Sequence, residues 1–242
     1  MEFGVGVASE DHVSERQRSY MHFLAARPDF VDAKCRATQW LLEILPVGLP
    51  VVEYFGGVGL VSTIIRGMLQ PSSHVIYELD ERCVEQLGFA YPGEDPHVIH
   101  GDARAYMGVG LPEPGGIAFL DFPHFTPLQG KWREGFGAVF RCQPSAVVVT
   151  DTALSMLGVH KKRYTQQFGL PVEGPRTYAM GFSAWLHRTH RYAATRVAQR
   201  GRNALYMLCV PASDPGYQEF REFPLEEEGA LFGSGDGFKW LS

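Results

Sequence analysis

The chain of 242 residues is 45% hydrophobic and 20% charged, which is ordinary for one large globular domain. Its net charge of −5 excludes a uniformly basic nucleic-acid-binding surface, and no apolar run approaches the ~20 residues that span a bilayer. The four cysteines are scattered without metal-ligand spacing, and the N-terminus lacks a signal-peptide core. We therefore expect a cytoplasmic protein with free thiols, no metal site and no membrane association.

The first 48 residues predict an arm followed by a helix. The arm is weakly patterned, with a short helix expected over residues 14–26. From Asp29 to Leu45, apolar residues recur at helical spacing. Asp29 can cap this helix, and Pro46 ends it.

Between residues 51 and 150, short apolar runs alternate with helical stretches. Strands are expected over residues 51–55, 74–79, 97–100, 116–120 and 146–150. Helices are expected over residues 60–69 and 81–90, with another ending at 138–142. This alternation predicts a doubly wound α/β sheet with mostly parallel strands and helices on both faces.

The pattern changes after residue 150. Helices are expected over residues 154–168 and 183–190, separated by a loop over 169–181. Residues 192–199 and 204–210 then read as an antiparallel hairpin. We therefore divide the chain into an N-terminal arm and helix (1–48), a main domain (49–212) and a C-terminal tail (213–242). The tail is expected either to be solvated or to dock through Phe232, Phe238 and Trp240.

A basic segment spans residues 160–202, where nine Lys or Arg residues face a single acid. Such a local surface can attract an anionic partner even when the total charge is negative. A solvated helix face is the alternative interpretation. Trp185, which lies among the basic residues, is expected to be a core residue.

A glycine-rich turn, Gly56-Gly57-Val58-Gly59, joins the first expected strand to the first helix. Glycines here let the backbone turn sharply and approach a ligand closely, although they can also serve packing alone. Acids follow the strands at four successive places: Glu53, Glu78, Asp102 and Asp121. One acid after a strand is usually a helix cap, but four acids at one edge of a parallel sheet indicate a ligand site.

These residues resemble the class I S-adenosylmethionine-dependent methyltransferases. Glu53-Tyr54-Phe55-Gly56-Gly57-Val58-Gly59 is similar to the first motif of the nucleic-acid enzymes of that family. The resemblance implies a Rossmann-like, seven-stranded sheet, mostly parallel with an antiparallel last strand, and S-adenosyl-L-methionine as cofactor. The cofactor-binding residues that it implies are Glu53, Phe55, Gly57, Gly59, Glu78, Asp102 and Ala103.

Asp121-Phe122-Pro123-His124 resembles the Asp/Asn-Pro-Pro-Tyr/Phe motif of enzymes that methylate exocyclic base amino groups. The resemblance implies that Asp121 and the carbonyl of Phe122 accept hydrogen bonds from the amino group, with Pro123 holding the turn. His124 or Phe125 would stack on the base. Phe122 and His124 depart from the motif, so Asp121 could instead serve the cofactor pocket, with Phe122 and Phe125 in the core.

The resulting hypothesis is an enzyme, an N-methyltransferase acting on adenine N6 or cytosine N4 in RNA or DNA. The basic side chains expected to contact nucleic acid are Lys161, Lys162, Arg163, Arg188 and Arg191. Two alternatives stay open. One is a methyltransferase for a protein or a small molecule, and the other is a methyltransferase fold that has lost catalysis and serves an assembly.

Overall fold

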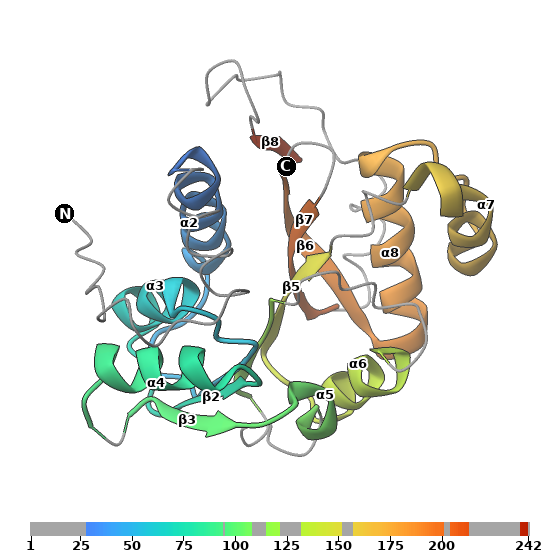
Figure 1. The fold of residues 1–242 in the computed structure, drawn as a ribbon. Helices are drawn as coiled ribbons and strands as arrows, with labels where there is room; N and C mark the ends of the chain where they lie inside the picture. The colour runs from blue at the N-terminus through green and yellow to red at the C-terminus, as the bar shows by residue number, and fades with distance from the viewer. Residues whose placement is uncertain are drawn as a thin grey trace.

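The computed structural model describes residues 28–93, 95–107, 115–121, 132–151, 157–200, 204–212 and 238–241. These residues build an α/β fold around one eight-stranded sheet, with strand order β3-β2-β1-β4-β5-β7-β6-β8 (Figure 1). The strands are β1 (Val51–Tyr54), β2 (His74–Glu78), β3 (His97–His100), β4 (Ile117–Leu120), β5 (Ala146–Asp151), β6 (Tyr192–Arg200), β7 (Ala204–Pro211) and β8 (Phe238–Leu241).

Strand directions confirm the mostly parallel sheet that the sequence predicts. Strands β1 to β5 are parallel to one another, and β7 runs antiparallel to both β5 and β6. The predicted seven-stranded sheet is confirmed in β1 to β7, and β8 adds an eighth strand that pairs antiparallel with β6 at the sheet edge. A four-residue strand in the C-terminal tail pairs with a strand far away in the chain, and local pattern does not reveal such a pairing.

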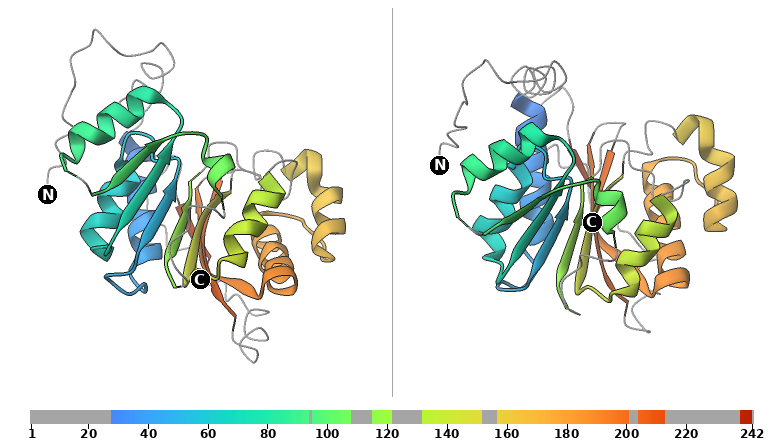
Figure 2. Two further views of the ribbon diagram at one scale, coloured as in Figure 1. Left: turned by 90° about the horizontal axis from the view of Figure 1, so that it is seen from below. Right: turned by 60° about the horizontal axis from the view of Figure 1, so that its bottom comes forward.

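Two helical layers cover the sheet (Figures 1 and 2). One face carries α2 (Pro28–Leu42), α3 (Leu60–Leu69) and α4 (Glu81–Ala90). The other face carries α5 (Ala103–Tyr106), α6 (Trp132–Arg141), α7 (Leu157–Phe168) and α8 (Pro175–His190). Each layer encloses its own apolar core against the sheet. No described helix is long and apolar enough to cross a membrane.

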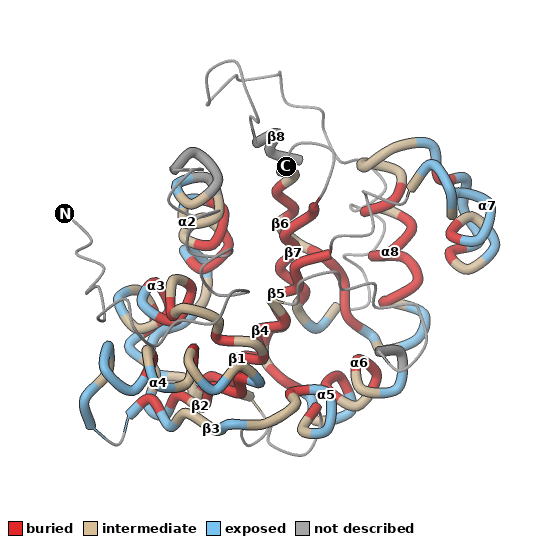
Figure 3. The backbone as a smooth tube through the Cα atoms, in the orientation of Figure 1, coloured by how far each residue is buried: buried red, intermediate tan, exposed pale blue. Residues whose placement is uncertain are grey.

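The central strands are buried on both faces, as Figure 3 shows. Every residue of β1, β4 and β5 is buried, which explains their nearly continuous apolar sequences. Two residues of these apolar strands are acids: Glu53 lies inside β1 and Asp151 ends β5, each with 0% exposure. Buried acids in the middle of an apolar sheet need partners, and the partners of Glu53 are part of the candidate site.

Helix α8 begins at Pro175, so the loop predicted over residues 169–181 is wrong in its second half. Thr177 Oγ1 accepts the backbone N–H groups of Glu173 (2.7 Å) and Gly174 (2.9 Å), and Pro175 suits a first helical position. Gly181 lies inside this helix, and a Cβ atom there would come within 2.5 Å of the Phe168 ring. Glycine, which suggests a loop in the sequence, is therefore required here by the close packing of α8 against α7.

The arm before residue 28 and most of the C-terminal tail lie outside the described residues, including the helix expected over 14–26 and Phe232. The N-terminal helix is confirmed as α2, which ends at Leu42, three residues before the predicted end. Trp185 is buried, as expected, in the core beneath α8.

Candidate active site

The glycine turn after β1 combines two different requirements. Phe55, Gly57 and Gly59 have positive φ angles of 69°, 53° and 82°. A Cβ on Gly56 would lie 2.3 Å from Ile76 Cγ2, so packing alone requires glycine there. A Cβ on Gly57 would meet nothing within 4 Å, so this part of the turn faces open space. The turn therefore packs on one side and leaves room for a ligand on the other.

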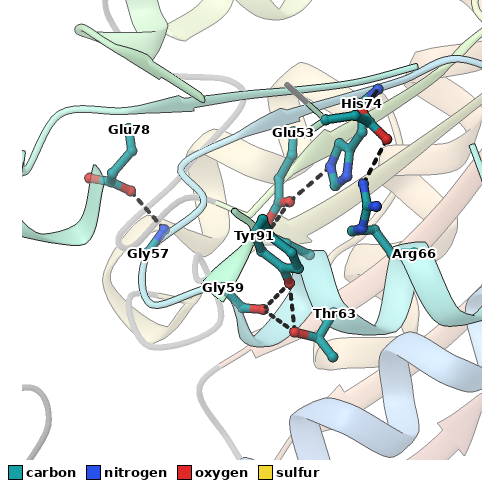
Figure 4. A network of polar contacts seen from close by, with 10 residues as sticks. Glu53, Gly57, Gly59, Thr63, Arg66, His74, Glu78 and Tyr91 are labelled. Carbon is teal, nitrogen blue, oxygen red and sulfur yellow. Dashed lines mark hydrogen bonds and ion pairs between the residues drawn. The ribbon is translucent and has the colours of Figure 1, made fainter. Parts of the chain in front are cut away.

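Glu78, the last residue of β2, is held beside this open glycine (Figure 4). Its Oε2 accepts the N–H of Gly57 at 2.7 Å, and its Oε1 accepts the N–H of Asp80 at 2.8 Å. Burial raises the pKa of Glu78, while these backbone hydrogen bonds oppose the rise. A carboxylate has about four acceptor sites, so Glu78 can still accept a hydroxyl group from a ligand beside its backbone partners.

Glu53 lies deeper, between β1 and α3. Its Oε2 accepts the hydroxyl of Ser62 at 2.7 Å and lies 3.3 Å from Nε2 of His74 (Figure 4). Its Oε1 is buried without a hydrogen-bond partner among the described residues. The Tyr91 hydroxyl, which bonds Thr63 at 2.6 Å, closes the same region from the end of α4. Glu53 is thus anchored between α3 and β2 and has acceptor capacity in reserve.

At the end of β3, Asp102 caps α5. Its carboxylate accepts the backbone N–H of Arg104 at 3.0 Å and pairs with the Arg104 guanidinium. The N–H of Gly101 donates to the carbonyl of Glu78 at 2.9 Å, which joins this segment to the end of β2. The helix-cap interpretation of Asp102 therefore holds, and its side chain is 33% exposed beside Ala103, which is buried.

Asp121 follows β4 and contacts two residues that the sequence did not single out. Its Oδ1 accepts the Thr150 hydroxyl at 2.8 Å, and its Oδ2 pairs with the ammonium of Lys34. A small hollow of about 10 Å³, room for roughly one water molecule, lies beside this cluster and is bordered by Thr38 and Val61 among others. Phe122, Pro123, His124 and Phe125 lie outside the described residues.

The predicted basic side chains fall into two groups. Lys161, Lys162 and Arg163 are exposed on α7, whose first residue follows the carboxyl end of β5 by six positions. Arg188 lies in the last turn of α8 and donates to the carbonyl of Phe168, the last residue of α7. Arg191 caps the C-terminus of α8.

Arg191 lies at the side of the sheet where the parallel strands begin, which we call the amino edge. The next residue, Tyr192, donates its hydroxyl to the Pro144 carbonyl, just before β5 begins. Glu78, Asp102 and Asp121 all lie at carboxyl ends of strands, at the opposite edge. The structure therefore brings the predicted acids and the glycine turn together but leaves Arg191 away from them.

Lys34, Thr150, Ser62 and His74 are the polar partners that sequence reasoning missed. Lys34 lies 87 residues from Asp121, and an isolated lysine in an amphipathic helix carries no signal for such a pairing. Within the described ranges, no group of three or more His, Cys, Asp or Glu side chains is arranged to hold a metal ion.

Comparison with solved structures identifies the architecture. Trm1 from Pyrococcus horikoshii, solved with S-adenosyl-L-methionine, superposes with a TM-score of 0.56 at 14% identity, over 88% of this chain and 66% of that one. The chain has the fold of a class I methyltransferase. The 23S rRNA methyltransferase ErmE is also similar (TM-score 0.49, 12% identity, 74% of this chain and 68% of that one). TrmN from Thermus thermophilus is more distant (TM-score 0.44, 18% identity, 72% and 48%). No family model and no curated protein matches this methyltransferase-fold chain in sequence.

Proposed function

We propose that this chain is an S-adenosyl-L-methionine-dependent methyltransferase that acts on nucleic acid. One observation carries the cofactor assignment: the open face of Gly57 lies directly beside a Glu78 carboxylate that keeps free acceptor lone pairs. A backbone turn without side chains and a carboxylate at the next strand end suit an adenosine-containing ligand in an open α/β sheet. The similar Trm1 fold, which was solved with this cofactor, supports the same assignment.

The residues present fit this cofactor. Glu78 would accept the ribose hydroxyls, and Asp102 with Ala103 would lie at the adenine. Phe55, Gly57 and Gly59 would approach the methionine end, with Glu53 anchored in β1 just before the turn. Leu79, whose side chain is 50% exposed directly after Glu78, offers the apolar surface that a purine ring covers.

The proposed substrate is an exocyclic amino group of adenine or cytosine in RNA or DNA. When bound, the cofactor supplies an activated methyl group on a sulfonium. Asp121 and the carbonyl of Phe122 would accept the two amino hydrogens and aim the nitrogen lone pair at the methyl carbon. The amino nitrogen would take up the methyl group, with the cofactor leaving as a neutral thioether, and would then lose a proton to water. His124 or Phe125 would stack on the base, and the three cations of α7 would contact phosphates.

The decisive experiment is methyl transfer from labelled cofactor to total RNA, genomic DNA and protein. We expect label in a nucleic acid, and we expect Asp121→Ala to remove it. Label in protein or metabolites alone would favour the first alternative substrate class. An Asp121→Ala variant as active as the parent would contradict the catalytic assignment.

A second candidate function is a methyltransferase fold without catalysis. The departures of Phe122 and His124 from the motif of base amino methyltransferases favour it. Calorimetry separates the two functions. Absence of cofactor binding would support the inactive fold, and binding that Glu78→Ala abolishes would argue against it.

A further inference from the structure

Three elements converge on the Asp121 carboxylate. Lys34 reaches it from α2, Thr150 reaches it from β5, and Asp121 itself follows β4. The side chains of Lys34 and Asp121 are 13% and 12% exposed. Withdrawing two charges this far from water is costly, so the pair differs from an exposed ion pair, which contributes little.

Thr150 and Lys34 together fix the orientation of the Asp121 carboxylate. A hydroxyl holds Oδ1 at 2.8 Å, and an ammonium holds Oδ2, so rotation about the Cβ–Cγ bond would break both contacts. Each oxygen still has a lone pair for a further donor. An acceptor held in advance loses less entropy when the substrate arrives than a freely rotating one.

We propose that Lys34, together with Thr150, is a positioning residue that fixes Asp121 as an oriented hydrogen-bond acceptor for the substrate amino group. The proposal rests on the methyl-transfer function above. The cation offsets the carboxylate charge, so Asp121 acts by orienting the amino group and does not remove its proton before attack. This suits an aromatic amine, whose neutral nitrogen already carries the attacking electron pair.

The held carboxylate is not fully enclosed. The Asp121 side chain keeps 12% of its surface exposed, and the water-sized hollow bordered by Lys34, Thr38, Asp121 and Thr150 is partly open to solvent. Helix α2 therefore belongs to the candidate active site as well as to the sheet covering. Its contribution to activity should depend on one side chain, Lys34.

The chain offers a matched control for Lys34. Arg36 lies on the same helix, pairs with Asp32 at 2.8 Å and is 51% exposed. Arg36→Met removes one cation from α2 without touching Asp121. Thr150→Val is a second, independent variant, because it removes the other partner of Asp121 with little change in shape.

The experiment measures kcat, KM for the methylated nucleic acid and calorimetric Kd for the cofactor in all four proteins, with melting curves to confirm folding. We expect Lys34→Met and Thr150→Val to lower kcat about 10- to 100-fold, because misplacing a catalytic group costs this much. We expect KM and the cofactor Kd to change less than about twofold, and Arg36→Met to behave like the parent. A fifth protein, Lys34→Arg, measured in the same way, should keep part of the kcat that Lys34→Met loses.

Three results overturn the proposal. If the parent is active and Lys34→Met matches Arg36→Met in kcat, the positioning role is wrong while the proposed function stands. If the Lys34 and Thr150 variants lose cofactor affinity and keep kcat, their role is in cofactor binding. A parent that methylates no nucleic acid overturns the proposed function and this inference together.

Discussion

Gly57 donates its backbone N–H to the Glu78 carboxylate at 2.7 Å, across 21 positions of sequence (Figure 4). This bond joins the turn after β1 to the end of β2 and places a carboxylate beside the face of Gly57 that has room for a ligand. Glu78→Ala should therefore weaken cofactor binding about tenfold or more, because two ribose hydroxyls lose a charged acceptor. Calorimetry measures this change. Glu85→Ala, an exposed carboxylate on α4, is the control, and an equal loss there would contradict the assignment.

Cofactor affinity should also depend on pH through Glu78. Burial raises the pKa of this carboxyl above its ordinary value of 4.5. Protonation turns an acceptor oxygen into a donor, so affinity should begin to fall at a pH above 4.5 as the solution is acidified. Calorimetric titrations over a pH series give this dependence, and Glu78→Gln should flatten it.

Protonation of Glu78, which should weaken cofactor binding, should instead increase the free energy of unfolding. Because the folded-state pKa of Glu78 is raised, the folded chain binds this proton more tightly than the unfolded chain does. The contribution of Glu78 to the free energy of unfolding therefore rises as pH falls through the raised pKa toward 4.5. Denaturant curves of the parent and Glu78→Gln would show it as a difference that depends on pH. A difference that is constant with pH would contradict the assigned cause.

Alanine substitutions of the two neighbouring glycines, Gly56 and Gly57, should affect different properties. Gly56→Ala places a methyl group 2.3 Å from Ile76 and should lower the free energy of unfolding by about 1–3 kcal/mol. Gly57→Ala meets no atom and costs about 1–2 kcal/mol through its positive φ alone, but it projects a methyl group into the ligand space. Denaturation and calorimetry together test this. Cofactor binding that survives Gly57→Ala would place the ligand elsewhere.

Nucleic-acid binding should separate the two groups of basic residues. Changing Lys161, Lys162 and Arg163 together to Gln should weaken binding and reduce the salt slope by about 0.9 for each phosphate that the variant no longer neutralises. Arg191→Gln should leave affinity unchanged, since Arg191 lies at the amino edge of the sheet. Filter binding over a salt series gives both numbers. If Arg191→Gln weakens binding more than the triple variant, the nucleic acid does not follow α7.

Arg196 belongs to the fold although it lies in the basic segment. It donates to the Trp40 carbonyl at the end of α2, lies 4.7 Å from the Trp40 ring centroid and reaches Glu43 at 3.2 Å. Arg196→Met should lower the free energy of unfolding by about 1–3 kcal/mol and leave nucleic-acid affinity unchanged. Arg163→Met, an exposed change on α7, should stay within about 0.5 kcal/mol of the parent. Equal effects of the two variants would contradict the contact between α2 and β6.

The sheet was predictable because its signals are local. Apolar runs mark β1, β4 and β5, and the glycine turn after Tyr54 marks the end of β1. In a parallel sheet the carboxyl ends of the strands meet at one edge. The convergence of Glu78, Asp102 and the glycine turn follows from that rule. The start of α8 was missed because Gly174 and Gly181 resemble loop residues, whereas one precedes the helix and the other packs against Phe168.

By itself the sequence determined where the parallel strands lie along the chain, the glycine turn and the row of acids, since each follows from short-range pattern and the geometry of parallel strands. The tertiary structure alone decided what these acids contact. Lys34 and Thr150 reach Asp121 from 87 and 29 residues away, and Ser62 and His74 enclose Glu53. It also separated Arg191 from the site and paired β8 with β6. Contacts of this kind depend on how whole helices and strands pack, and no local run of residues encodes them.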